Sequence, residues 1–217
     1  MIKGVIFDFD GTLTELTLDF ILLKKEILKI AERFIDRETI KSLDGFYVIE
    51  MIYELEGIIG DKGKLFSSEA FKRLEELEIE AASGKGLFSY SRDVLSWLTK
   101  RDIKIGIITR SCLAVLNMVF PDMNRYIHGV STREHTRYVK PDPRHVHHIL
   151  EIISVKPGDA MIVGDHPTDV HAGLQAGLMT VGVLSGRTKR QSFVDAGANF
   201  IVNDIKGLLP IIEMHGV

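Results

Sequence analysis

Short hydrophobic runs alternate with amphipathic segments along most of the chain after residue 85. These runs, and a similar run at the start of the chain, have the length of buried strands. The predicted strands cover 2–9, 103–109, 127–130, 160–164, 180–184 and 200–202. Hydrophobic residues three and four positions apart predict helices over 91–101, 113–120, 143–153, 168–176 and 205–214. Strands that alternate with helices predict an α/β fold, in which a parallel sheet carries helices on both faces.

Residues 15–85 have a different pattern, with helical spacing of hydrophobic positions and no run that resembles a strand. Ser67 and Ser68 are predicted to cap the third helix of this segment, because serine side chains satisfy the free N–H groups at a helix start. We therefore predict a helical domain, 15–85, inserted into a core that is formed by 1–14 and 86–217.

The composition is that of a folded soluble protein, with 45% hydrophobic and 26% charged residues. No hydrophobic run reaches the ~20 residues of a membrane span, and no secretory signal precedes the first strand. The net charge of −3 provides no basic field for nucleic acid or anionic membrane. The single cysteine excludes an internal disulfide and fits a reducing compartment. We therefore expect a cytoplasmic protein, monomer or homodimer, with neither nucleic acid nor membrane as a partner.

Polar residues suited to catalysis follow four of the predicted strands. The first strand ends in the sequence Asp8-Phe9-Asp10-Gly11-Thr12, and the second ends in Thr109-Arg110. Lys140-Pro141 follows the third, and Gly164-Asp165 ends the fourth, with Asp169 four residues later. Ligands of parallel sheets bind beyond the carboxyl ends of the strands, so we expect these groups to gather at one edge of the sheet.

Such a gathering has a definite chemistry. Carboxylates that lie close together raise one another's pKa unless a cation lies between them, and Mg²⁺ prefers carboxylate, water and phosphate oxygens as ligands. Lys140 and Thr109 add donors for an anionic group. Each motif alone also fits an ordinary turn or a solvated side chain, but their common position at strand ends favours a phosphoryl-transfer site with a carboxylate nucleophile.

The order of these motifs resembles that of the haloacid dehalogenase superfamily of hydrolases. The resemblance rests on Asp8–Thr12, Thr109, Lys140 and Gly164-Asp165 with Asp169. It implies a Rossmann-like three-layer parallel sheet core, and the position of the insert is similar to that of the helical cap in the phosphoglycolate phosphatase-like branch.

The resemblance also implies roles for the acidic residues. Asp8 would attack the substrate phosphorus and form an aspartyl-phosphate, and Asp10 would serve as the acid and then the base. Mg²⁺ would be bound by the carboxylates of Asp8 and Asp165 and by the backbone carbonyl of Asp10. Asp169 would orient the site from outside the ligand shell.

Thr109, Lys140 and Arg110 are the candidates for phosphate binding. Arg110 stands where the family more often has asparagine; either it contacts the phosphate or a second anionic group of the substrate, or it is a surface arginine. His166 stands in place of a common serine, and we expect it to form hydrogen bonds within its loop.

Three histidines, at positions 145, 147 and 148, lie on one predicted helix. A zinc site normally needs three or four ligands and no further partners are evident, so we predict an exposed polar face. Cys112 is predicted to be a small buried hydrophobic residue at a helix start.

The leading hypothesis is a Mg²⁺-dependent phosphatase that acts on a small phosphomonoester, phosphoglycolate-like or a sugar phosphate, with the helical insert as a lid. Two alternatives stay open. One is a phosphomutase of the β-phosphoglucomutase type, which returns the phosphoryl group to a sugar. The other is a non-catalytic regulatory module on the same scaffold.

Overall fold

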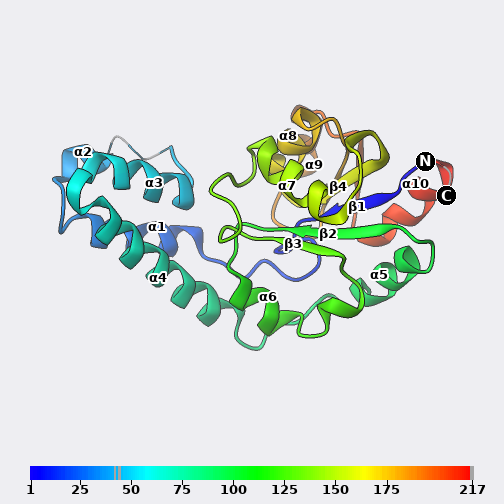
Figure 1. The fold of residues 1–217 in the computed structure, drawn as a ribbon, viewed down its shortest axis with the longest axis horizontal. Coiled ribbons are helices and arrows are strands. Elements are labelled where there is room, and N and C mark those ends of the chain that lie inside the picture. The colour runs from blue at the N-terminus through cyan, green and yellow to red at the C-terminus, as the bar shows by residue number, and fades with distance from the viewer. Residues whose placement is uncertain (42, 44, 216–217) are drawn as a thin grey trace. The chain divides into compact units, whose positions relative to one another are not determined.

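The computed structural model describes residues 1–41, 43 and 45–215. Residues 42, 44, 216 and 217, which the predicted domain ranges include, lie outside the described residues. The chain divides into two units, which we call the sheet unit (Met1–Leu16 and Gly84–Val217) and the helical unit (Thr17–Ser83). Figure 1 shows both as ribbons.

Six parallel strands form the centre of the sheet unit (Figure 1). Their spatial order is β3-β2-β1-β4-β5-β6, and every neighbouring pair is parallel. The strands are β1 (Gly4–Phe7), β2 (Lys104–Ile108), β3 (Gly129–Ser131), β4 (Ala160–Gly164), β5 (Met179–Val183) and β6 (Phe200–Val202). The predicted α/β fold with a parallel sheet is confirmed.

The strand order reverses between β1 and β4. The chain runs outward from β1 through β2 to β3 and then returns, so that β4 pairs with the free side of β1. Phe7 is in register with Val163, and the N–H of Asp8 continues the ladder by donating to the carbonyl of Val163 at 2.8 Å. Such a reversal is where α/β sheets bind their ligands, because the connections diverge and leave a crevice.

Helices cover both faces of the sheet, with α7 and α8 on one face and α5 and α6 on the other (Figure 1). A buried cluster joins Ile6 of β1 and Ile108 of β2 to Ile149 and Ile153 of α7. The helices are α5 (Ser91–Thr99), α6 (Leu113–Val119), α7 (Pro143–Ile153), α8 (Pro167–Gln175), α9 (Arg190–Asp195) and α10 (Leu208–Met214), with 3-10 turns η2 (Met123–Arg125), η3 (Pro157–Asp159) and η4 (Ile205–Gly207). The sequence pattern did not predict α9, which is short and has no side-chain cap.

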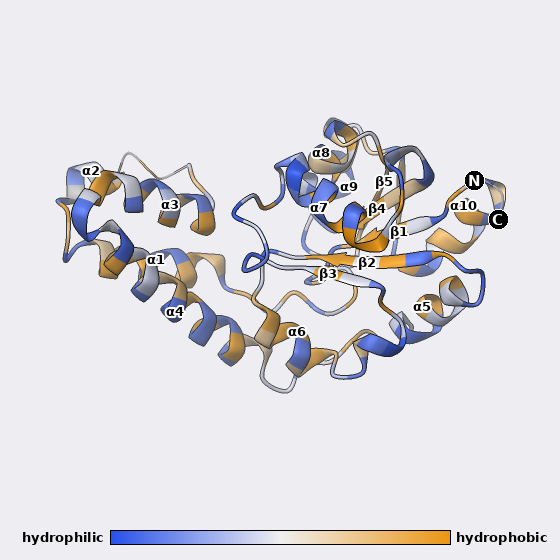
Figure 2. Cartoon of the chain, in the orientation of Figure 1, coloured by the Kyte–Doolittle hydropathy of each residue, from blue (hydrophilic) through white to orange (hydrophobic). Residues whose placement is uncertain are grey.

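The helical unit has helices only, within the residues that the structure describes. Its elements are α1 (Phe20–Ala31), α2 (Arg37–Lys41), α3 (Val48–Ile59), the 3-10 turn η1 (Gly60–Lys62) and α4 (Gly63–Ala82). Hydrophobic and hydrophilic residues alternate along α4, as Figure 2 shows, and the buried set includes Phe66, Ala70 and Leu74. Among the described residues, none of the helices combines the length and the hydrophobicity needed to cross a membrane.

The start of α4 corrects the predicted cap at Ser67 and Ser68. The helix begins at Gly63, and Ser67 is buried inside it, where its hydroxyl donates to the carbonyl of Lys64 at 3.3 Å. A Cβ atom at Gly63 would lie 2.0 Å from the carbonyl oxygen of Glu56 in α3. The close approach of these two helices therefore sets the helix start, which a capping rule does not detect.

Candidate active site

The ends of β1 and β4 bring two predicted site residues next to each other. Asp8 directly follows β1 and Asp165 directly follows β4, and both are largely buried, at 7% and 6% exposed. Because these strands are hydrogen-bonded neighbours in the same direction, their carboxyl ends meet at one edge of the sheet. The sheet topology thus brings together two carboxylates that are far apart in the sequence.

Two glycines make room for the Asp165 carboxylate. Gly11 has a φ of +90°, and a Cβ there would lie 2.2 Å from Oδ2 of Asp165. A Cβ at Gly186 would lie 1.9 Å from the same oxygen. Any side chain at either position would displace the carboxylate, so the loop after β1 depends on glycine both for its backbone conformation and for this space.

Lys140 lies between two of the acidic side chains. Its Nζ donates to Oδ1 of Asp8 at 2.5 Å and to Oδ1 of Asp169 at 2.6 Å, and its side chain is only 3% exposed. Burial alone would lower the pKa of Lys140, but the charges of Asp169 and Asp8 outweigh it and raise the pKa. Lys140 is therefore a fixed positive charge beside Asp8.

A third aspartate, Asp165, lies close to the two that Lys140 contacts. Ligand atoms of Asp8, Asp165 and Asp169 all lie within 4.8 Å of one another. Burial raises the pKa of Asp165 to about 9, and the charges of Asp8 and Asp169 add to the effect. Burial also raises the pKa of Asp8 to about 6, against the opposing charge of Lys140. The single positive charge of Lys140 does not balance three carboxylates, and hard oxygen donors of this kind fit a divalent cation.

Asp169 also organises the start of α8. Its Oδ2 accepts from the backbone N–H of His166 at 3.0 Å, while its other oxygen accepts from Lys140. The ring of His166 accepts from the N–H of Thr168 at 3.3 Å, which completes a capping box. The expectation that His166 forms hydrogen bonds within its loop is confirmed. Direct contact between Asp169 and Lys140 was not predicted.

Asp10 points its carboxylate to a different set of partners. Oδ1 accepts from Nζ of Lys85 at 2.6 Å, and Oδ2 accepts from the hydroxyl of Ser111 at 2.7 Å. Sequence reasoning missed both Lys85 and Ser111. Ser111 follows two residues after Thr109, at a strand end where polar residues were expected, whereas no pattern in the sequence marks Lys85.

Thr109 and Arg110 form the loop after β2. The hydroxyl of Thr109 accepts from the N–H of Ser111 at 3.0 Å, so Thr109 is linked to Asp10 through Ser111. Nη1 of Arg110 donates to the backbone carbonyl of Lys140, and the carbonyl of Arg110 accepts from Arg133 at 3.1 Å. Arg110 thus stabilises the loop that carries Lys140, and contact of Thr109 and Arg110 with a phosphate stays a prediction.

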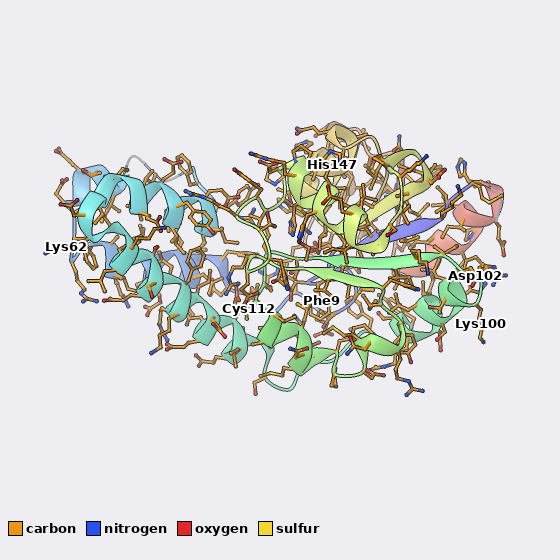
Figure 3. The ribbon with its side chains drawn as sticks, viewed as in Figure 1. Phe9, Lys62, Lys100, Asp102, Cys112 and His147 are labelled. Atoms are coloured by element: carbon orange, nitrogen blue, oxygen red, sulfur yellow. The ribbon has the colours of Figure 1, made fainter. Side chains whose placement is uncertain are left out.

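His145 corrects the prediction of an exposed histidine face. It is fully buried in α7, its Nδ1 accepts from the backbone N–H of Lys140 at 3.2 Å, and its Nε2 lies 3.1 Å from the carbonyl oxygen of Ser131. His147 on the same helix is exposed (Figure 3). His145 therefore joins the end of β3 to the backbone of Lys140. Cys112 is buried at the N-terminus of α6, as predicted.

The buried imidazole of His145 is expected to make stability depend on pH. Burial and the charge of Lys140 lower its pKa to about 3 from 6.5. Because the folded state disfavours the charged imidazole, the contribution of His145 to the free energy of unfolding is complete above pH 6.5. This contribution is lost as the pH falls towards 3, and the loss is on the order of 4 kcal/mol. The free energy of unfolding, measured between pH 7 and 4, should fall less for His145→Gln than for the wild type. His147→Gln is the control, and parallel curves for wild type and His145→Gln would contradict the prediction.

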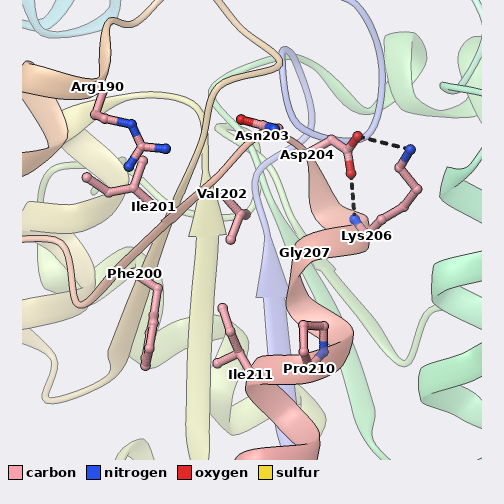
Figure 4. A pocket seen from close by; sticks show the side chains of 10 residues that line it. All are labelled: Arg190, Phe200, Ile201, Val202, Asn203, Asp204, Lys206, Gly207, Pro210 and Ile211. Carbon is pink, nitrogen blue, oxygen red and sulfur yellow. Dashed lines mark hydrogen bonds and ion pairs between the residues drawn. The ribbon is translucent and has the colours of Figure 1, made fainter.

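A separate pocket of about 600 Å³ lies beside β6 (Figure 4). Asp204 in this pocket accepts from the N–H of Lys206 at 2.8 Å and forms an ion pair with its ammonium group at 3.3 Å. The pocket is lined by Arg190, Phe200, Ile201, Val202, Asn203, Asp204, Lys206, Gly207, Pro210 and Ile211. None of the predicted site residues lines it, so the strand-end cluster is distinct from this pocket.

Comparison with known proteins gives consistent matches along the chain. Residues 5–183 match the family model described as haloacid dehalogenase-like hydrolase. A Pseudomonas putida protein named probable phosphoglycolate phosphatase is 24% identical over 161 residues, which are 73% of this chain and 61% of the relative. A Bacillus cereus protein named pyrophosphatase PpaX is 30% identical over 119 residues, 54% of this chain and 55% of the relative. Both matches thus span less than two thirds of the relative's own length.

Among solved structures, a β-phosphoglucomutase from Clostridium difficile aligns with a TM-score of 0.70 and 20% identity. The alignment covers 99% of this chain and 96% of the other. At this identity the likeness concerns the fold alone.

Proposed function

Since the chain belongs to the haloacid dehalogenase-like hydrolases, we propose that it is a Mg²⁺-dependent phosphatase that hydrolyses a small phosphomonoester through an aspartyl-phosphate. One observation carries the proposal. Asp8 lies in a buried cluster of carboxylates at the point where the strand order reverses, and its carboxylate accepts a hydrogen bond from the ammonium group of Lys140. A carboxylate that is fixed beside positive charge and away from bulk water is suited to attack a phosphorus atom.

In the first half of the reaction an oxygen of Asp8 attacks the substrate phosphorus. A new bond forms between this oxygen and phosphorus, and the bond from phosphorus to the leaving oxygen breaks. Asp10, two residues along the same loop, gives its proton to the leaving oxygen, so that an alcohol departs and Asp8 carries the phosphoryl group.

In the second half, water hydrolyses the aspartyl-phosphate. Asp10, now a carboxylate, takes a proton from water while the water oxygen bonds to phosphorus. The bond between phosphorus and the Asp8 oxygen then breaks, which releases inorganic phosphate and restores both carboxyl groups. Lys140 stays charged throughout and balances the negative charge around Asp8.

The predicted Mg²⁺ would be held by the carboxylates of Asp8 and Asp165 and by the backbone carbonyl of Asp10. The ion supplies positive charge beside the phosphoryl oxygens. Thr109, Arg110 and Lys140 are the proposed phosphate-binding residues. Asp169 would orient the site through its bond to Lys140.

The substrate is proposed to be phosphoglycolate-like or a sugar phosphate. The name of the Pseudomonas relative supports the first, and the name of the Bacillus relative adds pyrophosphate to the compounds worth testing. The helical unit is the proposed lid, since helical lids exclude water and contact the leaving group.

Release of phosphate from a panel of substrates tests the proposal. The panel contains phosphoglycolate, sugar phosphates, nucleoside monophosphates, pyridoxal phosphate and pyrophosphate, each with Mg²⁺ and with excess chelator. We expect turnover of at least one phosphomonoester with Mg²⁺ and a loss of roughly 10²-fold or more with chelator. Isomerised sugar phosphate without free phosphate would instead indicate a phosphomutase, and absence of any product would indicate a non-catalytic module.

A further inference from the structure

Lys85 and Ser111 hold the carboxylate of Asp10 from two sides. The ammonium group of Lys85 donates to Oδ1 and the hydroxyl of Ser111 donates to Oδ2, at 2.6 and 2.7 Å. Their sequence distances from Asp10 are 75 and 101 residues, so the tertiary fold alone brings the three together. We propose that Lys85 and Ser111 are positioning residues that fix the orientation of the Asp10 carboxylate for proton transfer. This inference rests on the proposed function, in which Asp10 is the acid and base.

The backbone around Lys85 is itself held against the loop that follows Asp10. The hydroxyl of Thr14 donates to the carbonyl of Gly86 at 2.6 Å, and the N–H of Phe88 donates to the carbonyl of Leu13 at 3.0 Å. Thr14 and Leu87 also form an antiparallel bridge. The backbone next to Lys85 is therefore held in place, and this positions its side chain for contact with Asp10.

Ser111 is fixed in a comparable way. Its own N–H donates to the hydroxyl of Thr109 at 3.0 Å, and Ser111 is 3% exposed. The side chain of Lys85 is 4% exposed, and that of Asp10 is 10% exposed. With little water available as a substitute partner, loss of either donor removes one of the two bonds that fix the orientation of the carboxylate.

The two donors leave Asp10 able to transfer a proton. A carboxylate has about four lone-pair sites, of which Lys85 and Ser111 use two. One remaining site on either oxygen can hold the proton that goes to the leaving oxygen. A positioning role therefore predicts a defect only in steps that need this proton transfer.

The test compares substrates that differ in their need for an acid. p-Nitrophenyl phosphate has a leaving group that departs as an anion, whereas phosphoglycolate and glucose 6-phosphate release alkoxides that must be protonated. With Mg²⁺ present, Lys85→Met is expected to lower kcat/KM for the alkyl phosphates by about 10-fold to 100-fold and for the aryl phosphate by less than about threefold. The ratio kcat/KM is compared because it reports the steps up to departure of the leaving group and excludes the later attack of water, in which Asp10 acts as the base for every substrate. Lys85→Arg should recover most of the loss, because it restores a charged donor.

A double-mutant cycle separates this role from a general structural one. In an Asp10→Asn background, Lys85→Met should change kcat by less than about twofold, because the group that it positions is already absent. Lys3→Met is the matched control, since Lys3 forms an ion pair with Asp159 of 2.8 Å at the opposite edge of the sheet. If Lys85→Met does not fold, the same substrate comparison and double-mutant cycle are carried out with Ser111→Ala, which removes a single oxygen atom.

Three results would overturn the inference: equal losses in kcat/KM on aryl and alkyl phosphates, a change in KM alone, or losses that add to that of Asp10→Asn. Wild-type protein that hydrolyses none of these esters would overturn the proposed function and the inference with it. Active wild-type protein with fully active Lys85→Met would overturn the inference only.

Discussion

Replacement of Asp8 by asparagine is expected to abolish phosphate release, with a loss of roughly 10⁴-fold or more in kcat. The amide has the shape of the carboxylate but lacks the nucleophilic oxygen, so no aspartyl-phosphate can form. The fold should persist, because Lys140 keeps its bond to Asp169 and the variant removes one of several crowded negative charges. Burial raises the pKa of Asp8 to about 6 against the opposing charge of Lys140, so a negative charge at this position is costly.

Two measurements check this expectation together. Steady-state release of phosphate gives the loss of turnover, and acid quenching with ³²P-labelled substrate shows whether label is bound to the protein. Wild type should carry label and Asp8→Asn should not, while the melting temperatures of the metal-free proteins should be similar. Asp159→Asn, which removes an exposed carboxylate beside Lys3, is the control for the charge change. Turnover near the wild-type rate in Asp8→Asn would refute a nucleophilic role for Asp8.

The fold was predictable because its hydrophobic pattern is regular. The predicted ranges of α7, β4 and β6 agree with the structure at both ends. α7 starts at a proline directly after a capping aspartate, which is a strong local signal for a helix start. The start of α4 was not predictable in this way, because it depends on the approach of Gly63 to α3.

The acidic cluster was predictable from the position of its residues relative to the strands. In a parallel sheet, the position of a residue directly after a strand specifies the edge at which it lies, so Asp8 and Asp165 could be placed without knowledge of their contacts. The burial of His145 is also consistent with the helical pattern. This histidine lies four residues before Ile149 and therefore on the buried stripe of its helix, where it contacts Lys140.

Lys85 shows the limit of sequence patterns. It follows no strand, lies on no amphipathic helix and stands between two glycines in a segment that joins the two units. Its contact with Asp10 arises only when residues 86–88 pair with the loop after β1. Long-range contacts of this kind leave no periodic signal, so they emerge only from the three-dimensional arrangement.

Replacement of Lys140 by methionine is expected to reduce both catalysis and stability. Loss of the ammonium group that faces Asp8 should lower kcat by roughly 10³-fold, the order of effect of removing a donor that stabilises transition-state charge. Methionine keeps most of the volume but leaves the carboxylates of Asp8 and Asp169 without their shared partner. Removing one member of a buried ion pair typically costs on the order of 3–5 kcal/mol.

The stability loss in Lys140→Met should depend on pH and on Mg²⁺. The pKa values of Asp8 and Asp165 are raised to about 6 and about 9 in the folded protein, so both groups favour the folded state at low pH and lose this contribution as they ionise. In the absence of metal, the difference in the free energy of unfolding between wild type and Lys140→Met should therefore increase from pH 5 towards pH 9. A divalent cation restores positive charge, so added Mg²⁺ should recover part of the deficit. Urea unfolding at several pH values, with Lys3→Met as the exposed ion-pair control, measures the effect. A deficit that does not change with pH or Mg²⁺ would mean that the role of Lys140 is packing rather than charge.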